Sequence, residues 1–244
     1  RTVATLVGGS SPWEIYEMIL SISYEGNVYT LGKNEKGCLG LEEEDIVIPK
    51  QIPTLKNIQA VSCGLHHSIL LDHSGVVYTI GSNDRGQLGI GKDDLSFFTN
   101  IPQLVEFPES IKQISCTLQS TFCLSINGNV YSFGSNIDGV LGLGHNYPQY
   151  YISPQQIKTL QDGEFIECGI LFTFCKTSKN QIYGWGNNEQ GQLGVGDMND
   201  YYRPALCNFP EDTIDIKCGY EHTLVLTSNQ EVYSCGNNNF GQLG

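Results

Sequence analysis

The chain has 244 residues and a formal net charge of −13, because 26 acidic residues outnumber 13 basic ones. An acidic chain disfavours binding to DNA or RNA, whose phosphates need clustered Lys and Arg, and favours a basic or mixed protein partner. No run approaches the roughly 18 apolar residues of a transmembrane helix, and residues 1–11 carry no visible secretory signal.

The N-terminal segment is less regular than the rest of the chain. Strands are expected at Thr2–Val7 and Met18–Ser23, with a long connection between them that contains Trp13. The sequence then becomes repetitive, and it ends inside a repeat without having begun with Met. We therefore expect a piece of a longer chain.

The repeat is an apolar run around a Val-Tyr pair, followed by glycines at fixed offsets, and its fullest copy is Val77–Gly91. The tyrosine falls at positions 29, 78, 131, 183 and 233, so the gaps are 49, 53, 52 and 50 residues. Two other features keep this period: a Cys at positions 63, 116, 168 and 218, and a Pro at positions 49, 102, 154 and 204. Three features with one long period indicate a repeat architecture.

Each unit predicts four short strands, which in the second unit are Ile58–Cys63, Ser68–Leu71, Val76–Ile80 and Gln103–Val105. The segment Asp72–Gly75 predicts a hairpin turn between the second and third strands, and Asn127-Gly128 predicts a type I′ turn at the same place in the third unit. Proline cannot donate to a sheet ladder. A proline that opens the fourth strand therefore makes that strand the outer edge.

Four-stranded antiparallel sheets repeated around an axis form a β-propeller. We predict an all-β propeller region over residues 1–244, with five units near residues 1–53, 54–106, 107–159, 160–209 and 210–244, the last without its fourth strand. A superhelical stack of sheets is the structural alternative, although stacked β-solenoid repeats are typically shorter than this period.

Nine cysteines, at positions 38, 63, 116, 123, 168, 175, 207, 218 and 235, do not predict a disulfide framework or a metal site. Four of them share one repeat position and so belong to four different units, outside disulfide reach, and no CxxC pair occurs. We expect small buried thiols in a reducing, intracellular compartment, nucleus or cytoplasm, and no metal or cofactor.

The pattern resembles the regulator of chromosome condensation repeat family. The residues that carry the resemblance are the runs Val77–Gly89 and Ile182–Gly194 and the Cys-Gly-x-x-His segments Cys63–His67 and Cys218–His222. The family fold is a seven-bladed propeller, so the resemblance implies that five of seven blades are present. The family's founding member is a guanine-nucleotide exchange factor for the small GTPase Ran and binds chromatin. Other members are GTPase regulators, light receptors, or propellers attached to ubiquitin ligases and kinases.

The repeated polar and glycine residues have structural explanations. Gly81, Gly86 and Gly89 suit positions with positive φ or close backbone approach. The asparagines of the same turn can bond neighbouring backbone, and they are Asn83, Asn136, Asn188 and Asn238. A phosphate-binding loop would need a following Gly-Lys-Ser/Thr and a helix, which the sequence lacks.

The histidines do not indicate catalysis. His67 and His222 occupy one repeat position three units apart, where the third and fourth units have Ser120 and Phe172, so they cannot share a metal. A buried histidine bonded to backbone is the expected role. No catalytic constellation can be assembled, and we predict no enzyme.

Function is expected where the copies differ, in the loops before the fourth strand. Aromatic pairs recur there and would lie on one side of the disc, with aspartates nearby that favour a basic partner. The predicted partner-binding residues are Phe97, Phe98, Tyr150, Tyr151, Tyr201, Tyr202, Asp93, Asp94, Asp197, Asp200 and, in the first loop, Trp13. The alternative is that at least one ring of each pair packs on its own or the next blade. The run Glu42–Asp45 is expected to be a solvated charge run.

We predict a protein-interaction propeller that serves as a scaffold or small-GTPase regulator. One alternative is an active exchange factor for Ran or a related GTPase, although no wedge-like hairpin insertion is visible. A second alternative is a substrate- or partner-binding propeller attached to a larger ubiquitin ligase or kinase.

Overall fold

The computed structural model describes residues 3–8, 17–91 and 97–244, whose strands form five antiparallel sheets. The first sheet contains β1 (Val3–Gly8), β2 (Glu17–Ile22), β3 (Val28–Lys33) and β4 (Asp45–Gln51), and the second contains β5 (Ile58–Cys63), β6 (His67–Asp72), β7 (Val77–Ser82) and β8 (Phe98–Val105). The third contains β9 (Ile111–Cys116), β10 (Ser120–Ser125), β11 (Val130–Ser135) and β12 (Tyr150–Gln156), and the fourth contains β13 (Gly163–Cys168), β14 (Phe172–Thr177), β15 (Ile182–Gly186) and β16 (Tyr201–Leu206). The fifth contains β17 (Thr213–Cys218), β18 (His222–Thr227) and β19 (Val232–Gly236), and two 3₁₀ turns, η1 (Glu35–Gly37) and η2 (Ile137–Gly139), lie in the first and third units.

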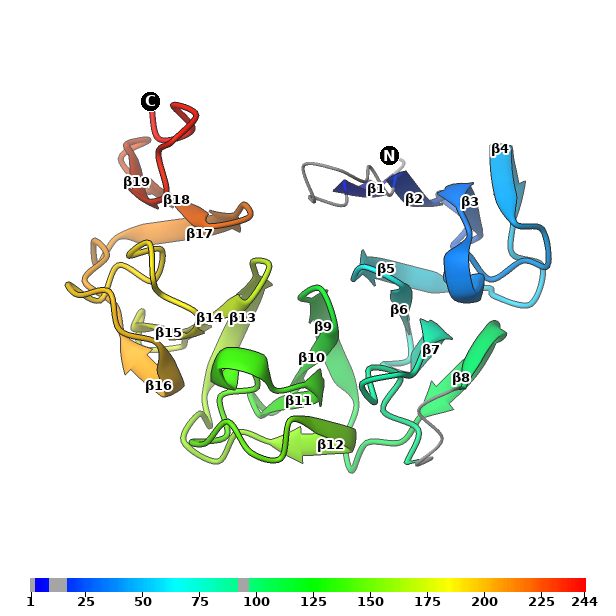
Figure 1. Cartoon of the computed structure of the whole chain (residues 1–244), viewed down its shortest axis with the longest axis horizontal. Helices are drawn as coiled ribbons and strands as arrows, with labels where there is room; N and C mark the ends of the chain where they lie inside the picture. Colours follow the sequence, from blue (N-terminus) through cyan, green and yellow to red (C-terminus); the bar gives the residue numbers. More distant parts are fainter. Residues whose placement is uncertain (1–2, 9–16, 92–96) are drawn as a thin grey trace.

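The five sheets follow one another around an arc (Figure 1). The first strands β5, β9, β13 and β17 point towards the centre, and the fourth strands β4, β8, β12 and β16 lie on the outside. The predicted all-β propeller architecture is therefore confirmed, and the sheets are not stacked in a line. No helix among the described residues is long and apolar enough to cross a membrane.

The apolar core is divided into four clusters, one at each seam between neighbouring sheets. The first cluster joins Leu20 and Ile52 of the first unit to Ile58 and Leu70 of the second, all at most 1% exposed. Equivalent clusters fill the second, third and fourth seams. Because the third sheet lies between two seams and buries side chains on both, β10 is buried along its whole length.

Among the described residues, the last sheet packs against a neighbouring sheet on one face only. Along β18, buried residues alternate with exposed ones, and Leu224 and Leu226 are each 36% exposed. Their faces have no further sheet against them in the part of the chain that the structure describes. The number of blades in a complete ring, seven by family resemblance, stays a prediction.

A side chain also crosses each seam to bond the carbonyl oxygen of the residue that follows the loop glycine. The hydroxyl groups donate from Ser68 to Cys38 (2.7 Å), from Thr121 to Gln87 (2.9 Å) and from Thr223 to Gln192 (2.8 Å). At the third seam the donor is instead the indole Nε1–H of Trp185, 2.8 Å from the Val140 carbonyl oxygen. A buried carbonyl group is thereby satisfied at every seam.

The turns between the second and third strands differ from the type I′ turn predicted at Asn127-Gly128. Ser125 N–H donates to Asn129 (2.9 Å) and Gly128 N–H donates to Ser125 (3.1 Å), which closes a three-residue loop, and only Gly128 of the predicted pair has positive φ, 82°. All five hairpins place one residue in this left-handed position. The five residues are Gly26, Gly75, Gly128, Asn180 and Gln230.

The outer strands begin earlier than predicted. β8 starts at Phe98 rather than after the proline, and Pro102 lies within the strand at a bulge, where Gly81 pairs with Thr99 and Thr79 with Gln103. The other outer strands bulge at the same register, around Pro49, Pro154 and Pro204. A bulge on an edge strand tolerates a residue without an N–H, so the proline marks the bulge and not the start of the strand.

Candidate functional site

A buried asparagine organises each loop between the third and fourth strands. The Asn188 Oδ1 accepts from Leu193 N–H (3.0 Å), and its amide donates to the carbonyl oxygens of Asp197 (2.9 Å) and Asn199 (3.0 Å). The expected role in the turn is thus confirmed, and the bond to the leucine recurs at Asn34, Asn83, Asn136 and Asn238. These bonds fix the shape of the loops that carry the predicted site.

Replacing Asn188 with Asp is expected to lower the free energy of unfolding by about 2–3 kcal/mol. The two carbonyl oxygens would lose the amide that donates to them and would face a buried carboxylate oxygen instead. Urea denaturation followed by circular dichroism measures this loss. The matched control is Asn238→Asp in the exposed loop of the last sheet, where we expect less than about 0.5 kcal/mol. Equal losses in the two variants would contradict the role given to the Asn188 amide.

Five of the six paired aromatic residues lie at the beginning of the outer strands rather than in loops, and the sixth, Phe97, immediately precedes β8. Phe98 is 58% exposed and Tyr202 is 37% exposed, whereas Tyr151 and Tyr201 are partly buried and pack against the third cluster. The Tyr202 ring lies directly over Gly139 of the preceding sheet, where an added Cβ would come within 2.3 Å of the ring. Both expected environments, outward rings and rings packed on a neighbouring blade, therefore occur.

The three pairs do not occupy equivalent positions. The residues that pair with the same repeat glycine of the third strand are Thr99, Tyr151 and Tyr201. Relative to these, the pairs Phe97-Phe98, Tyr150-Tyr151 and Tyr201-Tyr202 move forward by one residue from each sheet to the next. Since successive side chains in a strand point to opposite faces, the shift places Phe98, Tyr150 and Tyr202 on one face of their sheets and Tyr151 and Tyr201 on the other.

The aspartates of the fourth unit take part in the loop. Asp197 accepts from Asn199 N–H (3.0 Å) and from the Tyr201 hydroxyl (3.0 Å). These two bonds hold the pKa of Asp197 below its usual value, and the bond from the Asn199 backbone contributes most. The hydrogen bond to the Asp197 carboxylate raises the pKa of Tyr201. Asp200 accepts from Asn188 N–H at 2.8 Å. Trp13, Asp93 and Asp94 lie outside the described residues.

The inner strands line a hollow of about 490 Å³ at the hub. The four cysteines of the repeat face it, and all nine cysteines of the chain are free thiols. Burial raises the pKa of Cys63 and Cys168 to about 12 and that of Cys116 and Cys218 well above the ordinary value. The thiols therefore stay protonated and neutral at neutral pH.

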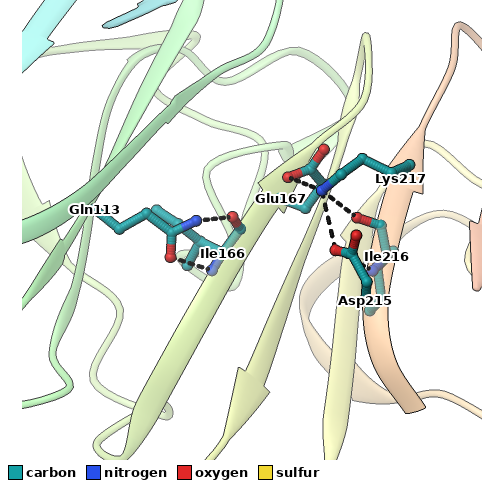
Figure 2. A network of polar contacts seen from close by, with 6 residues as sticks. All are labelled: Gln113, Ile166, Glu167, Asp215, Ile216 and Lys217. Atoms are coloured by element: carbon teal, nitrogen blue, oxygen red, sulfur yellow. Dashed lines mark hydrogen bonds and ion pairs between the residues drawn. The ribbon is translucent and has the colours of Figure 1, made fainter. Parts of the chain in front are cut away.

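Polar contacts that sequence reasoning missed join the inner strands of neighbouring sheets (Figure 2). The Gln113 amide of β9 pairs with both backbone groups of Ile166 in β13, at 2.7 and 3.0 Å. Lys217 of β17 lies between Glu167 of β13 (3.5 Å) and Asp215 (3.0 Å). Burial raises the pKa of Glu167 even though the Lys217 ammonium opposes the shift.

The described repeats identify the family. Residues 25–71, 74–124, 127–175 and 179–226 match the regulator of chromosome condensation (RCC1) repeat, and residues 58–87 and 214–242 match a second description of the same repeat. A repeated four-stranded propeller with these motifs defines the class, and the chain belongs to the regulator of chromosome condensation repeat family.

Two curated relatives illustrate the sequence similarity. The chain is 31% identical over 200 residues to the Ultraviolet-B receptor UVR8 of Arabidopsis thaliana, covering 79% of this chain and 44% of the receptor. It is 38% identical over 186 residues to the probable E3 ubiquitin-protein ligase HERC4 of Mus musculus, covering 75% of this chain and 17% of the ligase. The chain therefore spans less than half the length of these relatives.

Two solved structures have the same fold. Yeast RCC1 (Prp20), solved bound to Kap60, has a TM-score of 0.81 and 24% identity, over 93% of this chain and 55% of the yeast chain. Human WBSCR16 has a TM-score of 0.76 and 23% identity, over 86% of this chain and 55% of the human chain. At this identity the similarity establishes the fold alone.

Proposed function

We propose that the chain is the repeat region of a protein-interaction propeller that acts as a scaffold or as a regulator of a small GTPase. The observation that carries the proposal is the match of four successive repeats to the regulator of chromosome condensation repeat. The solved structure of Prp20p from Saccharomyces cerevisiae is described together with its binding to Gsp1p and histones, which is a property of that protein. The narrower alternatives, an exchange factor for Ran or a ligase- or kinase-attached propeller, are not favoured over this broader role.

We propose binding without catalysis. The protonated thiols at the hub are poor nucleophiles, and burial lowers the pKa of His67 to about 3, so its ring stays neutral and held by Thr121 (3.0 Å). Nine free thiols also support a reducing, intracellular compartment.

For the partner surface we propose the end of the sheets where the outer strands begin, including the exposed rings of Phe98 and Tyr202. A photo-crosslinking residue at Tyr202 should capture a partner protein, and an excess of unmodified chain should compete with the capture. The matched position is His73, an exposed residue in a hairpin at the opposite end of the strands. Capture from His73 as strong as from Tyr202 would contradict the proposed surface.

The GTPase role is tested with Ran that carries a fluorescent nucleotide. Complex formation should raise the fluorescence anisotropy of Ran at micromolar concentrations of the chain, and the same sample reports nucleotide release. Binding without faster release supports regulation or scaffolding, and faster release would instead establish exchange activity. If the chain neither binds Ran nor accelerates nucleotide release, the Ran-directed role is ruled out.

A further inference from the structure

The outer rims of two seams are closed by a backbone hydrogen bond. Gly91 N–H donates to Ile152 of the next sheet (2.8 Å), and Gly144 N–H donates to Tyr202 of the next sheet (2.6 Å). Both glycines have positive φ, 69° and 95°. In each case the loop lies across the bulge of the following outer strand.

The first seam lacks this closure because its glycine is replaced. Counting from the preceding Leu-Gly pair, the position of Gly91 and Gly144 is Glu42, and the carbonyl of the bulge is that of Asn100. No backbone hydrogen bond joins Glu42 to Asn100 within the described part of the chain. A residue with a Cβ resists the left-handed conformation that the other two loops use.

The opening is confined to the rim. Deeper in the same seam, Gly37 lies against the backbone of Asn100, and Gly40 packs on Ile52 and Ile80. Their counterparts in the second and third seams make equivalent contacts with the next sheet. The first seam is therefore as closely packed at its core as the others. Only the outer loop stands away from the next sheet.

Two adjoining hollows of about 590 and 520 Å³ occupy the opening and share Leu41, Glu42, Glu43 and Asn100. Their apolar wall includes Phe98 and Ile101 of β8, which are 58% and 64% exposed. We call this feature the rim groove. Exposed apolar side chains beside an open backbone carbonyl suit an extended peptide.

The rim groove is also negatively charged. Five carboxylates line it against two ammonium groups, and they are Glu35, Glu42, Glu43, Glu44 and Asp45 against Lys33 and Lys36. Lys33 pairs with Asp45, Lys36 with Asp84 outside the groove, and Lys50 with Glu43. Within the described residues Glu42 and Glu44 form no ion pair, so their charges are available to a cationic partner.

We propose that the rim groove binds an extended protein segment with alternating basic and aliphatic side chains. The aliphatic side chains contact Phe98 and Ile101, and the basic side chains contact the carboxylates. A peptide N–H donates to the Asn100 carbonyl oxygen, whose counterparts in the second and third seams accept from Gly91 and Gly144. The rim groove shares Phe98 with the partner surface proposed above and adds to it a specific site and the chemistry of its ligand. Its test uses neither Ran nor a probe at Tyr202, so its failure is distinguishable from failure of the proposed function.

The test is fluorescence anisotropy of a labelled eight-residue peptide, (Lys-Leu-Arg-Val)₂, titrated with the 244-residue chain at low salt. The wild-type chain should bind it, and 0.3 M salt should weaken the binding because charge contributes. Glu42→Gly restores the glycine of the closed seams and should weaken binding at least tenfold, as should Ile101→Ser. Circular dichroism melts establish that each variant is folded.

Matched variants separate the groove from general charge and apolarity. Glu189→Gln removes an exposed carboxylate from the fourth unit, and Leu206→Ser removes an outer-strand side chain that is 54% exposed. Both should bind the peptide as the wild type does, and a peptide with Glu in place of Lys and Arg should not bind. The proposal is overturned by no binding at 1 mM wild-type chain, by unchanged binding in Glu42→Gly and Ile101→Ser, or by equal losses in the matched variants.

Discussion

Replacing Trp185 with alanine is expected to lower the free energy of unfolding by about 3–5 kcal/mol, which is a large share of the stability of a typical domain. The Trp185 side chain is fully buried at the third seam, and its ring lies 6.2 Å from that of Phe122 between centroids. The variant removes this packing and also leaves the Val140 carbonyl oxygen without its donor.

Two variants divide the effect of Trp185. Trp185→Phe keeps an aromatic ring and loses the indole N–H, so we expect a loss of about 1–3 kcal/mol, chiefly from the unpaired carbonyl group. Urea denaturation followed by far-ultraviolet circular dichroism measures both variants, because tryptophan fluorescence changes with the substitution. A loss below about 1 kcal/mol in Trp185→Ala would show that the third seam does not depend on this ring.

Acidification is expected to destabilise the chain through His67, which is fully buried at the second seam. Its Nε2 lies 3.0 Å from the Thr121 hydroxyl, and its Nδ1 has no hydrogen-bond partner among the residues that the structure describes. Burial, with a smaller contribution from His66 and against that of Asp84, lowers the pKa of His67 from 6.5 to about 3. Between these pH values the folded chain binds fewer protons than the unfolded chain, so the contribution is fully present above pH 6.5 and is lost as the pH falls.

The size of the effect follows from the pKa difference. Between pH 7 and pH 5 we expect His67 to remove about 2 kcal/mol of unfolding free energy, and about 4 kcal/mol by pH 3. His67→Phe is a suitable variant because Phe172 occupies the same position in the fourth sheet and lies over Gly169 as His67 lies over Gly64. Urea midpoints at pH 7 and pH 5 should differ less in His67→Phe than in the wild type, and equal differences would rule out His67 as the source.

The fold was predictable because its determinants recur in the sequence. The period of the Tyr, Cys and Pro positions indicated the sheets, and Gly81, Gly86 and Gly89 do have positive φ, 110°, 73° and 66°. The start of each outer strand was not predicted correctly, because the proline was interpreted as a strand boundary. A proline at an edge fits either a first residue or a bulge, and the sequence does not distinguish these two cases.

Two further features of the site were predictable from the sequence. Counting back from Pro102, Pro154 and Pro204 gives the one-residue shift of the aromatic pairs, since these prolines share one register. The replacement of a repeat glycine by Glu42 was also visible. By contrast, the bond from Trp185 to Val140 and the contact of Glu167 with Lys217 depend on side-chain directions across two sheets, which no spacing in one chain segment reveals.

The bulged outer strands also bear on how separate molecules meet. An outer strand with a continuous row of free N–H and C=O groups would invite strands of other chains to add to it. Here the ladder is interrupted at the same point on all four outer strands, and the interruption includes a residue that cannot donate. These four outer strands can therefore expose apolar side chains such as Val47, Ile101 and Leu206 and still resist edge-to-edge pairing with other chains.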